Sequence, residues 1–338
     1  TTTSSMLASI ALQAVEDPSY LIGEPLSATG VNAHCGHDEV LVLEADESYG
    51  TFTFMAPAIV GITNIEADHL DYYGTEAVLR AAFAQLAERA TEACVVWADD
   101  AQASEVGTIS GALTVGTALT CNYVVREVAL TQHGAGFTLE TPSGQSAEIS
   151  LKVGGMHNVA NAAVAAAMAD LAGWSGETIA AGLAAFGGVT RRFERRGEVA
   201  GVSLIDDYAH LPTEVEATVT AAAASGFNKL VVIFQPHRYT RISNVGSQFA
   251  GSFAGADVVI VTPIYAAGEE PIVGVSSALV SNAIRADGSV ATVIDVESLD
   301  EAADLVAQLA AEGTVVLSLG AGDSTTLPDL IADRLQQS

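Results

Sequence analysis

The sequence predicts an α/β protein of two domains: a parallel sheet carrying appended antiparallel hairpins, followed by a mainly parallel, doubly wound sheet. With 338 residues, the chain is longer than one ordinary hydrophobic core requires. Apolar runs of strand length alternate with segments of helical periodicity in both halves of the chain. A charged stretch with a glycine pair, residues 186–197, separates the two patterns. We therefore expect domains at residues 1–188 and 189–338.

The first domain is expected to begin with a helix over residues 1–15, whose apolar residues share one face after a threonine and serine run. Residues 122–153 alternate with period two and are broken by turn signals, which predicts the antiparallel hairpins. Alanine-rich helices follow, one after Asn158 and one near Ile179. Buried parallel strands are predicted at residues 39–45, 59–65 and 93–99, with a helix at residues 76–90.

The second domain shows a regular alternation of apolar strands and helices. This rhythm is typical of a right-handed, doubly wound sheet. Helices are predicted from Pro212 onward and over residues 299–311. The strands are predicted at residues 202–206, 229–234, 257–261, 291–295 and 314–319.

The formal net charge of -28 argues against nucleic acid and anionic membranes as partners, because both are bound through basic surfaces. Six of the arginines nevertheless lie in two short stretches. Such grouping fits a small anionic ligand and fits charge balance against nearby carboxylates equally well. The six are Arg191, Arg192, Arg195, Arg196, Arg238 and Arg241.

The sequence indicates a soluble cytoplasmic protein. No apolar run approaches the roughly 20 residues that span a bilayer, and no basic segment precedes an apolar one at the start. The three cysteines, Cys35, Cys94 and Cys121, are widely spaced and form no CxxC pair, which favours neither a disulfide framework nor a zinc site. The oligomeric state stays open.

Acidic side chains follow two predicted strands of the first domain. Glu44, Asp46 and Glu47 end the first strand, and NIEADHLD ends the next with Glu66, Asp68, His69 and Asp71. Strand ends of an open α/β sheet are where ligands bind, and carboxylate oxygens suit magnesium. One such cluster would more simply cap the following helix or turn. Two clusters on neighbouring strands favour a metal site.

Four further segments carry candidate site residues. HNVANA opens a helix and places Asn158 and Asn161 on one face, suited to a purine edge or phosphate oxygens, although Asn158 suits a helix N-cap equally. RRFE lies at the domain boundary, DDYAHLPTE follows the first strand of the second domain, and FQPHRYTR follows the second strand. We expect the last three to face the first domain's carboxylates across a cleft.

The motifs EADES, TNIEADHLD, HNVANA, RRFE, DDYAHLPTE, FQPHRYTR, IYAAGEEPI and GAGD occur in this order. Along its entire length the chain thereby resembles the central and C-terminal domains of the Mur ligase family, in the branch that joins L-alanine to UDP-N-acetylmuramic acid. The resemblance implies a P-loop-like ATPase domain followed by a Rossmann-like ligase domain. TTTSSM resembles the tail of a GTxGKT phosphate loop, whose lysine and glycines the chain lacks. We therefore expect little ligase activity from the chain alone.

The resemblance also implies site residues and cofactors, namely ATP and Mg²⁺. In the first domain, Thr1, Glu44 and His69 resemble magnesium ligands, and Thr1, Asn158 and Asn161 resemble nucleotide contacts. The implied substrates are UDP-N-acetylmuramic acid, L-alanine and ATP, and the implied intermediate is an acyl phosphate. The implied products are UDP-N-acetylmuramoyl-L-alanine, a precursor in peptidoglycan synthesis, together with ADP and phosphate.

In the second domain, Arg192 and Asp207 resemble ATP contacts, whereas His210, Arg238 and Arg241 resemble parts of the amino-acid and acyl-phosphate site. His210 is the candidate base for the attacking amine.

Two positions depart from patterns common among Mur ligases. Leu211 stands where the branch commonly has a second histidine, which puts the role of His210 in doubt. Phe83 lies where several sister enzymes carry a carbamoylated lysine, in agreement with the alanine-adding branch.

Two other functions fit the same residues. The same chemistry with a recycled peptide or another amino acid as acceptor is one, and a non-catalytic nucleotide-binding fragment is another. A dinucleotide oxidoreductase is disfavoured because no G-x-G-x-x-G turn follows a first strand.

Overall fold

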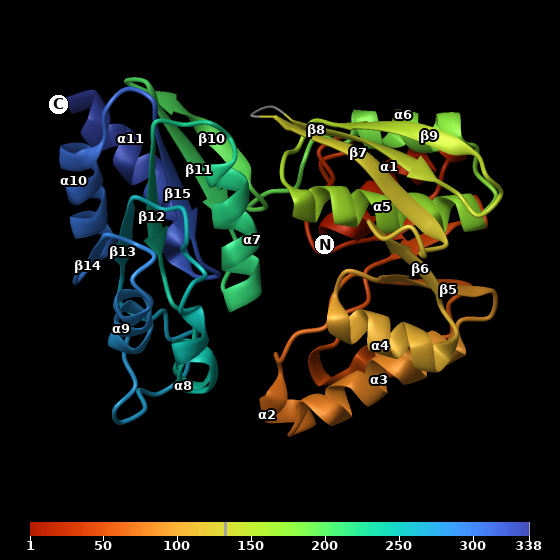
Figure 1. Ribbon diagram of the computed structural model, residues 1–338, viewed down its shortest axis with the longest axis horizontal. Helices are drawn as coiled ribbons and strands as arrows, with labels where there is room; N and C mark the ends of the chain where they lie inside the picture. Colours follow the sequence, from red (N-terminus) through yellow and green to blue (C-terminus); the bar gives the residue numbers. More distant parts are fainter. Residues whose placement is uncertain (132–133, 338) are drawn as a thin grey trace. The chain divides into compact units, whose positions relative to one another are not determined.

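The computed structural model describes residues 1–131 and 134–337, with the side chain of Asp71 outside the description. The chain forms two compact units, Thr1–Val189 and Thr190–Ser338. Each unit combines helices with β-strands (Figure 1).

Two sheets form the first unit. A small sheet has the order β2-β1-β3, and a larger one runs in sequence order from β4 to β9. Strands β4 to β7 are parallel, and β7, β8 and β9 are antiparallel neighbours. The predicted hairpins are thus present. The strands are β1 (Ser19–Leu21), β2 (Ala33–His34), β3 (Leu41–Leu43), β4 (Ile59–Ile62), β5 (Ala93–Trp97), β6 (Leu113–Gly116), β7 (Tyr123–Thr131), β8 (Gly134–Glu140) and β9 (Ser146–Leu151).

The larger sheet has a hydrophobic core on each face. On β5, Val95 and Trp97 join the core that includes α1, α5 and α6, whereas Cys94 and Val96 join the core that includes α3 and α4. This alternation follows from the period-two geometry of a strand. The helical segments are α1 (Thr2–Ala14), η1 (Ser48–Phe54), α2 (Leu70–Tyr73), α3 (Glu76–Arg89), α4 (Ala101–Ser110), α5 (Met156–Leu171) and α6 (Gly176–Ala185).

The strand predicted at residues 39–45 is shorter and less buried than expected. Only Leu41–Leu43 form a strand, and it pairs with β1 in the small sheet. Val42 is 4% exposed, but Leu41 is 62% exposed and Leu43 is 39% exposed. The prediction of a buried strand was therefore wrong, because only the Val42 face lies against a core, and helix α1 contacts the strand.

The second unit is a doubly wound sheet of order β10-β11-β15-β12-β13-β14. All neighbouring pairs are parallel except β10 with β11. The edge strand β10 was not predicted, because its sequence ERRGEV has no apolar run. The strands are β10 (Glu194–Val199), β11 (Val202–Asp207), β12 (Lys229–Phe234), β13 (Val258–Val261), β14 (Thr292–Asp295) and β15 (Thr314–Leu319).

Helices cover both faces of this sheet. On β12, Leu230, Val232 and Phe234 share one core with α7, α8 and α9, whereas Val231 and Ile233 share the other with α10 and α11. No helix within the described residues is long and apolar enough to cross a membrane. The helical segments are α7 (Pro212–Ala223), α8 (Tyr239–Val245), η2 (Gly246–Phe249), α9 (Ala278–Asp287), α10 (Leu299–Leu309), η3 (Asp323–Thr326) and α11 (Leu327–Gln337).

Candidate functional site

Thr1 and Glu44 lie side by side at the start of α1 and the end of β3. The Thr1 hydroxyl donates to Glu44 Oε1 at 2.6 Å, and Ser4 Oγ and the Gly23 amide donate to Oε2 at 2.8 and 2.7 Å. Burial acts to raise the pKa of the Glu44 carboxyl, and the hydrogen bonds from Thr1, Gly23 and Ser4 act to lower it. The structure thus presents a carboxylate beside a hydroxyl.

A second polar cluster surrounds His69, which precedes α2 in a left-handed conformation with φ of 53°. Its Nε2 lies 3.3 Å from Ser48 Oγ, 3.7 Å from Glu47 Oε1 and 3.6 Å from Asp68 Oδ2. Burial raises the pKa of the Glu47 carboxyl. Asp71, which we expected at this edge, has a side chain outside the described residues. The cluster combines an imidazole with hard oxygen atoms.

Glu44 and His69 belong to these two separate clusters, and no hydrogen bond or ion pair joins them in the described part of the chain. Within residues 1–131 and 134–337, no group of three or more histidine, cysteine, aspartate or glutamate side chains is arranged to hold a metal ion. The joint magnesium site of Thr1, Glu44 and His69 therefore stays a prediction.

The two asparagines of HNVANA lie near the start of α5. Asn158 is buried, and its Nδ2 donates to Gly154 O at 2.7 Å and lies 3.1 Å from His157 Nε2. It is not the N-cap, a position that Gly155 occupies. The Asn161 amide oxygen accepts a hydrogen bond of 2.9 Å from Thr3 Oγ1, so α5 and α1 meet beside Thr1. Nucleotide contact by either residue stays a prediction.

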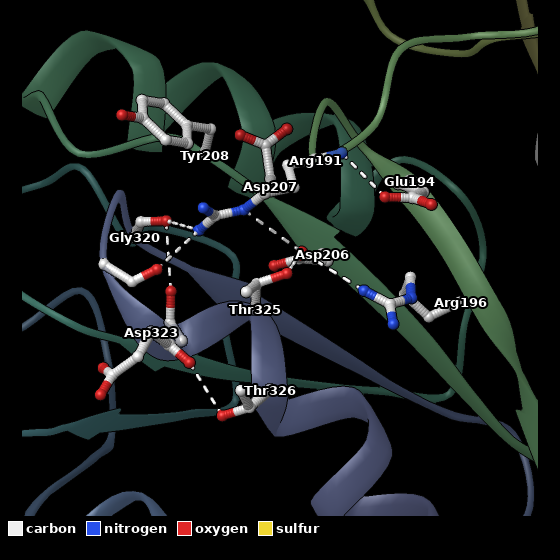
Figure 2. Close-up of polar contacts among 12 residues, drawn as sticks. Arg191, Glu194, Arg196, Asp206, Asp207, Tyr208, Gly320, Asp323, Thr325 and Thr326 are labelled. Atoms are coloured by element: carbon white, nitrogen blue, oxygen red, sulfur yellow. Dashed lines mark hydrogen bonds and ion pairs between the residues drawn. The ribbon is translucent and has the colours of Figure 1, made fainter. Parts of the chain in front are cut away.

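In the second unit, a buried aspartate at the end of β11 lies among cationic groups. Asp206 is 0% exposed, and Figure 2 shows its carboxylate between Arg191 and Arg196. Its Oδ2 lies 3.6 Å from Arg191 Nε and 3.8 Å from Arg196 Nη1, and it accepts a hydrogen bond of 2.8 Å from Thr325 Oγ1. Burial raises the pKa of Asp206, and the hydrogen bond and both arginines oppose that rise.

The neighbouring Asp207 holds the backbone of two segments through hydrogen bonds. Its two oxygens accept hydrogen bonds of 2.7 Å from the Phe193 and Ala209 amides. Burial raises the pKa of Asp207 to about 6, and the Arg192 guanidinium opposes the rise. The Arg192 guanidinium carbon lies 5.1 Å from the centre of the Tyr208 ring, a cation–π distance. Asp207 and Arg192 are therefore brought together, while their contact with ATP stays a prediction.

His210 has one ring nitrogen directed at protein acceptors. Its Nδ1 lies 2.9 Å from Tyr208 O and 3.3 Å from Glu214 Oε2. A carbonyl can only accept, so Nδ1 carries a proton and Nε2 is the basic nitrogen of the neutral ring. Leu211 is buried, and its amide donates to Glu214 Oε2 at 3.2 Å. The geometry is compatible with a base at Nε2.

His210, Arg238 and Arg241 gather around His237, a residue that sequence reasoning missed. The His237 ring stacks on Tyr265 with centroids 5.7 Å apart, and its centroid lies 6.0 Å from that of His210. Arg241 Nη1 lies 2.8 Å from His237 Nδ1, which must accept because a guanidinium only donates. Burial and the charges of Arg241, His210 and Arg238 lower the pKa of His237 to about 4. The four-residue spacing of His237 and Arg241 was the available signal.

The folds of the two units define a two-domain α/β protein with charged side chains at the carboxyl ends of its strands, the place where open α/β sheets usually bind ligands. Two family descriptions match it. Mur ligase middle domain matches residues 1–169, and Mur ligase, glutamate ligase domain, matches residues 191–322. The chain belongs to the Mur ligase family.

Relatives resemble this chain along its whole length. UDP-N-acetylmuramate–L-alanine ligase of Thermobifida fusca (strain YX) is 40% identical over 349 residues, which cover 99% of this chain and 73% of that protein. The protein of the same name from Saccharopolyspora erythraea is 41% identical over 350 residues, covering 100% and 71%. The crystal structure of UDP-N-acetylmuramate-alanine ligase from Thermotoga maritima superposes on this chain with a TM-score of 0.81 and a sequence identity of 29%. The match covers 100% of this chain and 73% of the Thermotoga maritima chain.

Proposed function

We propose that this protein catalyses the ATP-dependent joining of L-alanine to UDP-N-acetylmuramic acid, giving UDP-N-acetylmuramoyl-L-alanine, ADP and phosphate. The observation that carries this proposal is the identity of about 40% with ligases of that name over 99% or more of the chain. The polar strand ends of both units supply the kinds of group that such a reaction needs. The reaction would supply a peptidoglycan precursor in the cytoplasm.

Glu44 and Thr1 fit a magnesium ion that accompanies ATP. The Thr1 hydroxyl oxygen lies 2.6 Å from Glu44 Oε1, so two hard oxygen donors adjoin. Magnesium is usually held by one or two carboxylates together with phosphate oxygens and water, so a larger protein cluster is not required. When bound, the ion would offset the charge that develops on the phosphates. His69 is proposed as a further ligand, although it belongs to a separate cluster.

Asn158 and Asn161 are proposed nucleotide contacts in the first unit, and Arg192 with Asp207 is the proposed ATP contact in the second. Arg238 and Arg241 are proposed to bind the carboxylate of the acceptor amino acid, because guanidinium groups pair with carboxylates through two parallel hydrogen bonds. The bond from Arg241 to His237 would orient that guanidinium.

The proposed chemistry proceeds in two displacements. A carboxylate oxygen of UDP-N-acetylmuramic acid attacks the γ-phosphorus of ATP in line, and the bond to the β-γ bridging oxygen breaks to release ADP. The amine of L-alanine then attacks the carbonyl carbon of the acyl phosphate, and phosphate leaves with the former carboxylate oxygen. The ammonium of L-alanine must first lose a proton. His210 Nε2 is the proposed acceptor, because the bond to Tyr208 O keeps the ring proton on Nδ1.

An acceptor panel tests this function. The chain, extended at its N-terminus by the portion that its relatives carry, is given ATP, magnesium and UDP-N-acetylmuramic acid with L-alanine, L-serine, glycine or a tripeptide. We expect phosphate release to be fastest with L-alanine. Preference for the tripeptide would assign a peptide-recycling activity instead, and no release with any acceptor would contradict ligase function.

A further inference from the structure

The segment that leads into β10 has an unusual backbone. Arg191 and Phe193 both adopt left-handed conformations, with φ of 57° and 52°, which cost about 1 to 2 kcal/mol each for residues with a Cβ. Hydrogen bonds hold this backbone to the second unit. Tyr208 N donates to Arg191 O at 2.7 Å, Arg191 N donates to Glu194 Oε2 at 2.8 Å, and Phe193 N donates to Asp207 Oδ2 at 2.7 Å. The segment is therefore built into this unit.

The Arg191 side chain is a further anchor, and Figure 2 shows it directed at the loop after β15. Its Nη2 donates to Gly320 O at 2.6 Å and to Gly322 O at 3.2 Å, and its Nε faces Asp206 at 3.6 Å. The side chain is only 17% exposed. Arg191 thus ties the segment to two strand ends through a partly buried guanidinium, which is strongly oriented by such fixed acceptors.

Arg192, the next residue, is arranged differently. Its guanidinium lies over the Tyr208 ring at 5.1 Å and forms no hydrogen bond or ion pair with any residue that the structure describes. Arg191 lies at 4.9 Å from the centre of the same ring. One arginine is therefore committed to protein acceptors, and the adjacent one keeps its donors for an anionic ligand.

We propose that Arg191, fixed by Asp206 and the carbonyls of Gly320 and Gly322, is a positioning residue that sets Arg192 on the Tyr208 ring for contact with the ATP phosphates. This inference rests on the proposed function. Arg191 itself touches no substrate and acts through the left-handed backbone that it anchors. Loss of its side chain frees that backbone, so Arg192 must be ordered at the moment when ATP binds, which weakens binding.

Arg196 provides a matched control. Its guanidinium also lies beside Asp206, at 3.8 Å, but it projects from β10 and pairs with Asp329 at 3.2 Å. Replacing Arg196 removes one positive charge from beside Asp206, as replacing Arg191 does, but it leaves the hydrogen bonds to the Gly320 and Gly322 carbonyls intact. A purely electrostatic role for Arg191 would therefore be matched by Arg196, and a positioning role would not.

The experiment measures KM for ATP and for L-alanine in the N-terminally extended chain, with Arg191→Ala, Arg191→Lys, Arg192→Ala, Arg196→Ala and the Arg191→Ala/Arg192→Ala pair. We expect Arg191→Ala and Arg192→Ala each to raise the KM for ATP about tenfold, and the pair to raise it no more than Arg192→Ala alone. Arg191→Lys keeps the charge but cannot bond both carbonyls in the same way, so it should raise this KM severalfold. The KM for L-alanine should stay within about twofold throughout.

Three results would overturn the positioning role: an Arg191→Lys or Arg191→Ala enzyme that matches Arg196→Ala, an additive effect near one hundredfold in the pair, or an equal rise in both KM values. If the extended chain without substitutions forms no product, the proposed function is contradicted instead, so the two failures are distinguishable.

Discussion

At the scale of single residues, His237 and Asp207 should give the second unit opposite dependences of stability on pH. Burial lowers the pKa of His237 from 6.5 to about 4, so the unfolded chain takes up a proton before the folded one does as pH falls. Burial raises the pKa of Asp207 from 3.8 to about 6, so the folded chain holds the extra proton. His237 therefore makes the free energy of unfolding increase with pH, whereas Asp207 makes it decrease with pH.

We predict that His237→Asn removes the first contribution. Between pH 6.5 and 4, His237 costs the folded state up to about 3 kcal/mol, because a shift of one unit is worth about 1.4 kcal/mol. The variant should therefore lose less stability on acidification than the unchanged chain. Urea unfolding at a series of pH values measures this difference. The complementary Asp207→Asn variant should lose more on acidification, and parallel pH profiles in all three proteins would show that neither group titrates as proposed.

Gly23 sits where a side chain would disturb the Thr1 and Glu44 pair. A Cβ there would lie 2.8 Å from Thr1 Oγ1 and 2.9 Å from Glu44 Oε1, closer than normal contact. We predict that Gly23→Ala displaces the carboxylate and raises the magnesium concentration for half-maximal activity severalfold. Titration of activity with magnesium measures the effect. Gly30→Ala is not a suitable control, because Gly30 has a φ of 73° and a side chain there would strain the backbone. Unchanged magnesium dependence would argue against Glu44 and Thr1 as the metal site.

At the scale of elements, α1 and α6 meet closely because residue 182 has no side chain. A Cβ on Gly182 would lie 2.4 Å from Ile10 Cα and 2.9 Å from Ile10 N, and backbone cannot move aside cheaply. We predict that Gly182→Ala lowers the unfolding free energy of the first unit by about 2 kcal/mol, the range found for overpacked cores. Gly176→Ala in the same helix is the control, since its Cβ would meet only Ala147 Cβ at 3.5 Å. Equal thermal stability of the two variants would contradict close packing of α1 on α6.

The elements that the sequence predicted well are those with long apolar patterns. The doubly wound sheet, its two-sided cores and the appended hairpins all follow from periodicity. The short strands β1 and β2 were missed because two or three residues carry no readable period. Strand β10 was missed because its residues are mostly charged, and pairing with β11 overrides that weak propensity.

At the scale of the whole molecule, the candidate site was predictable as a set of strand ends but not as a set of contacts. The sequence placed Glu44 and Asp207 at carboxyl ends of strands, where the structure has them. It did not reveal that Asp207 accepts hydrogen bonds from two backbone amides, or that His237 contacts both Arg241 and His210. Both arrangements depend on how loops are positioned in the folded chain. Such long-range contacts are fixed by tertiary packing and leave no local pattern.

Ligation of L-alanine through an acyl phosphate is tested most directly by following one oxygen atom. UDP-N-acetylmuramic acid labelled with oxygen-18 in its carboxylate is given to the N-terminally extended chain with ATP, magnesium and L-alanine, and the mass of the released phosphate is measured. We expect each released phosphate to carry one labelled oxygen, and the amount of phosphate to equal that of UDP-N-acetylmuramoyl-L-alanine. Unlabelled phosphate alongside the product would contradict the proposed intermediate, and labelled phosphate without the L-alanine product would contradict the assigned acceptor.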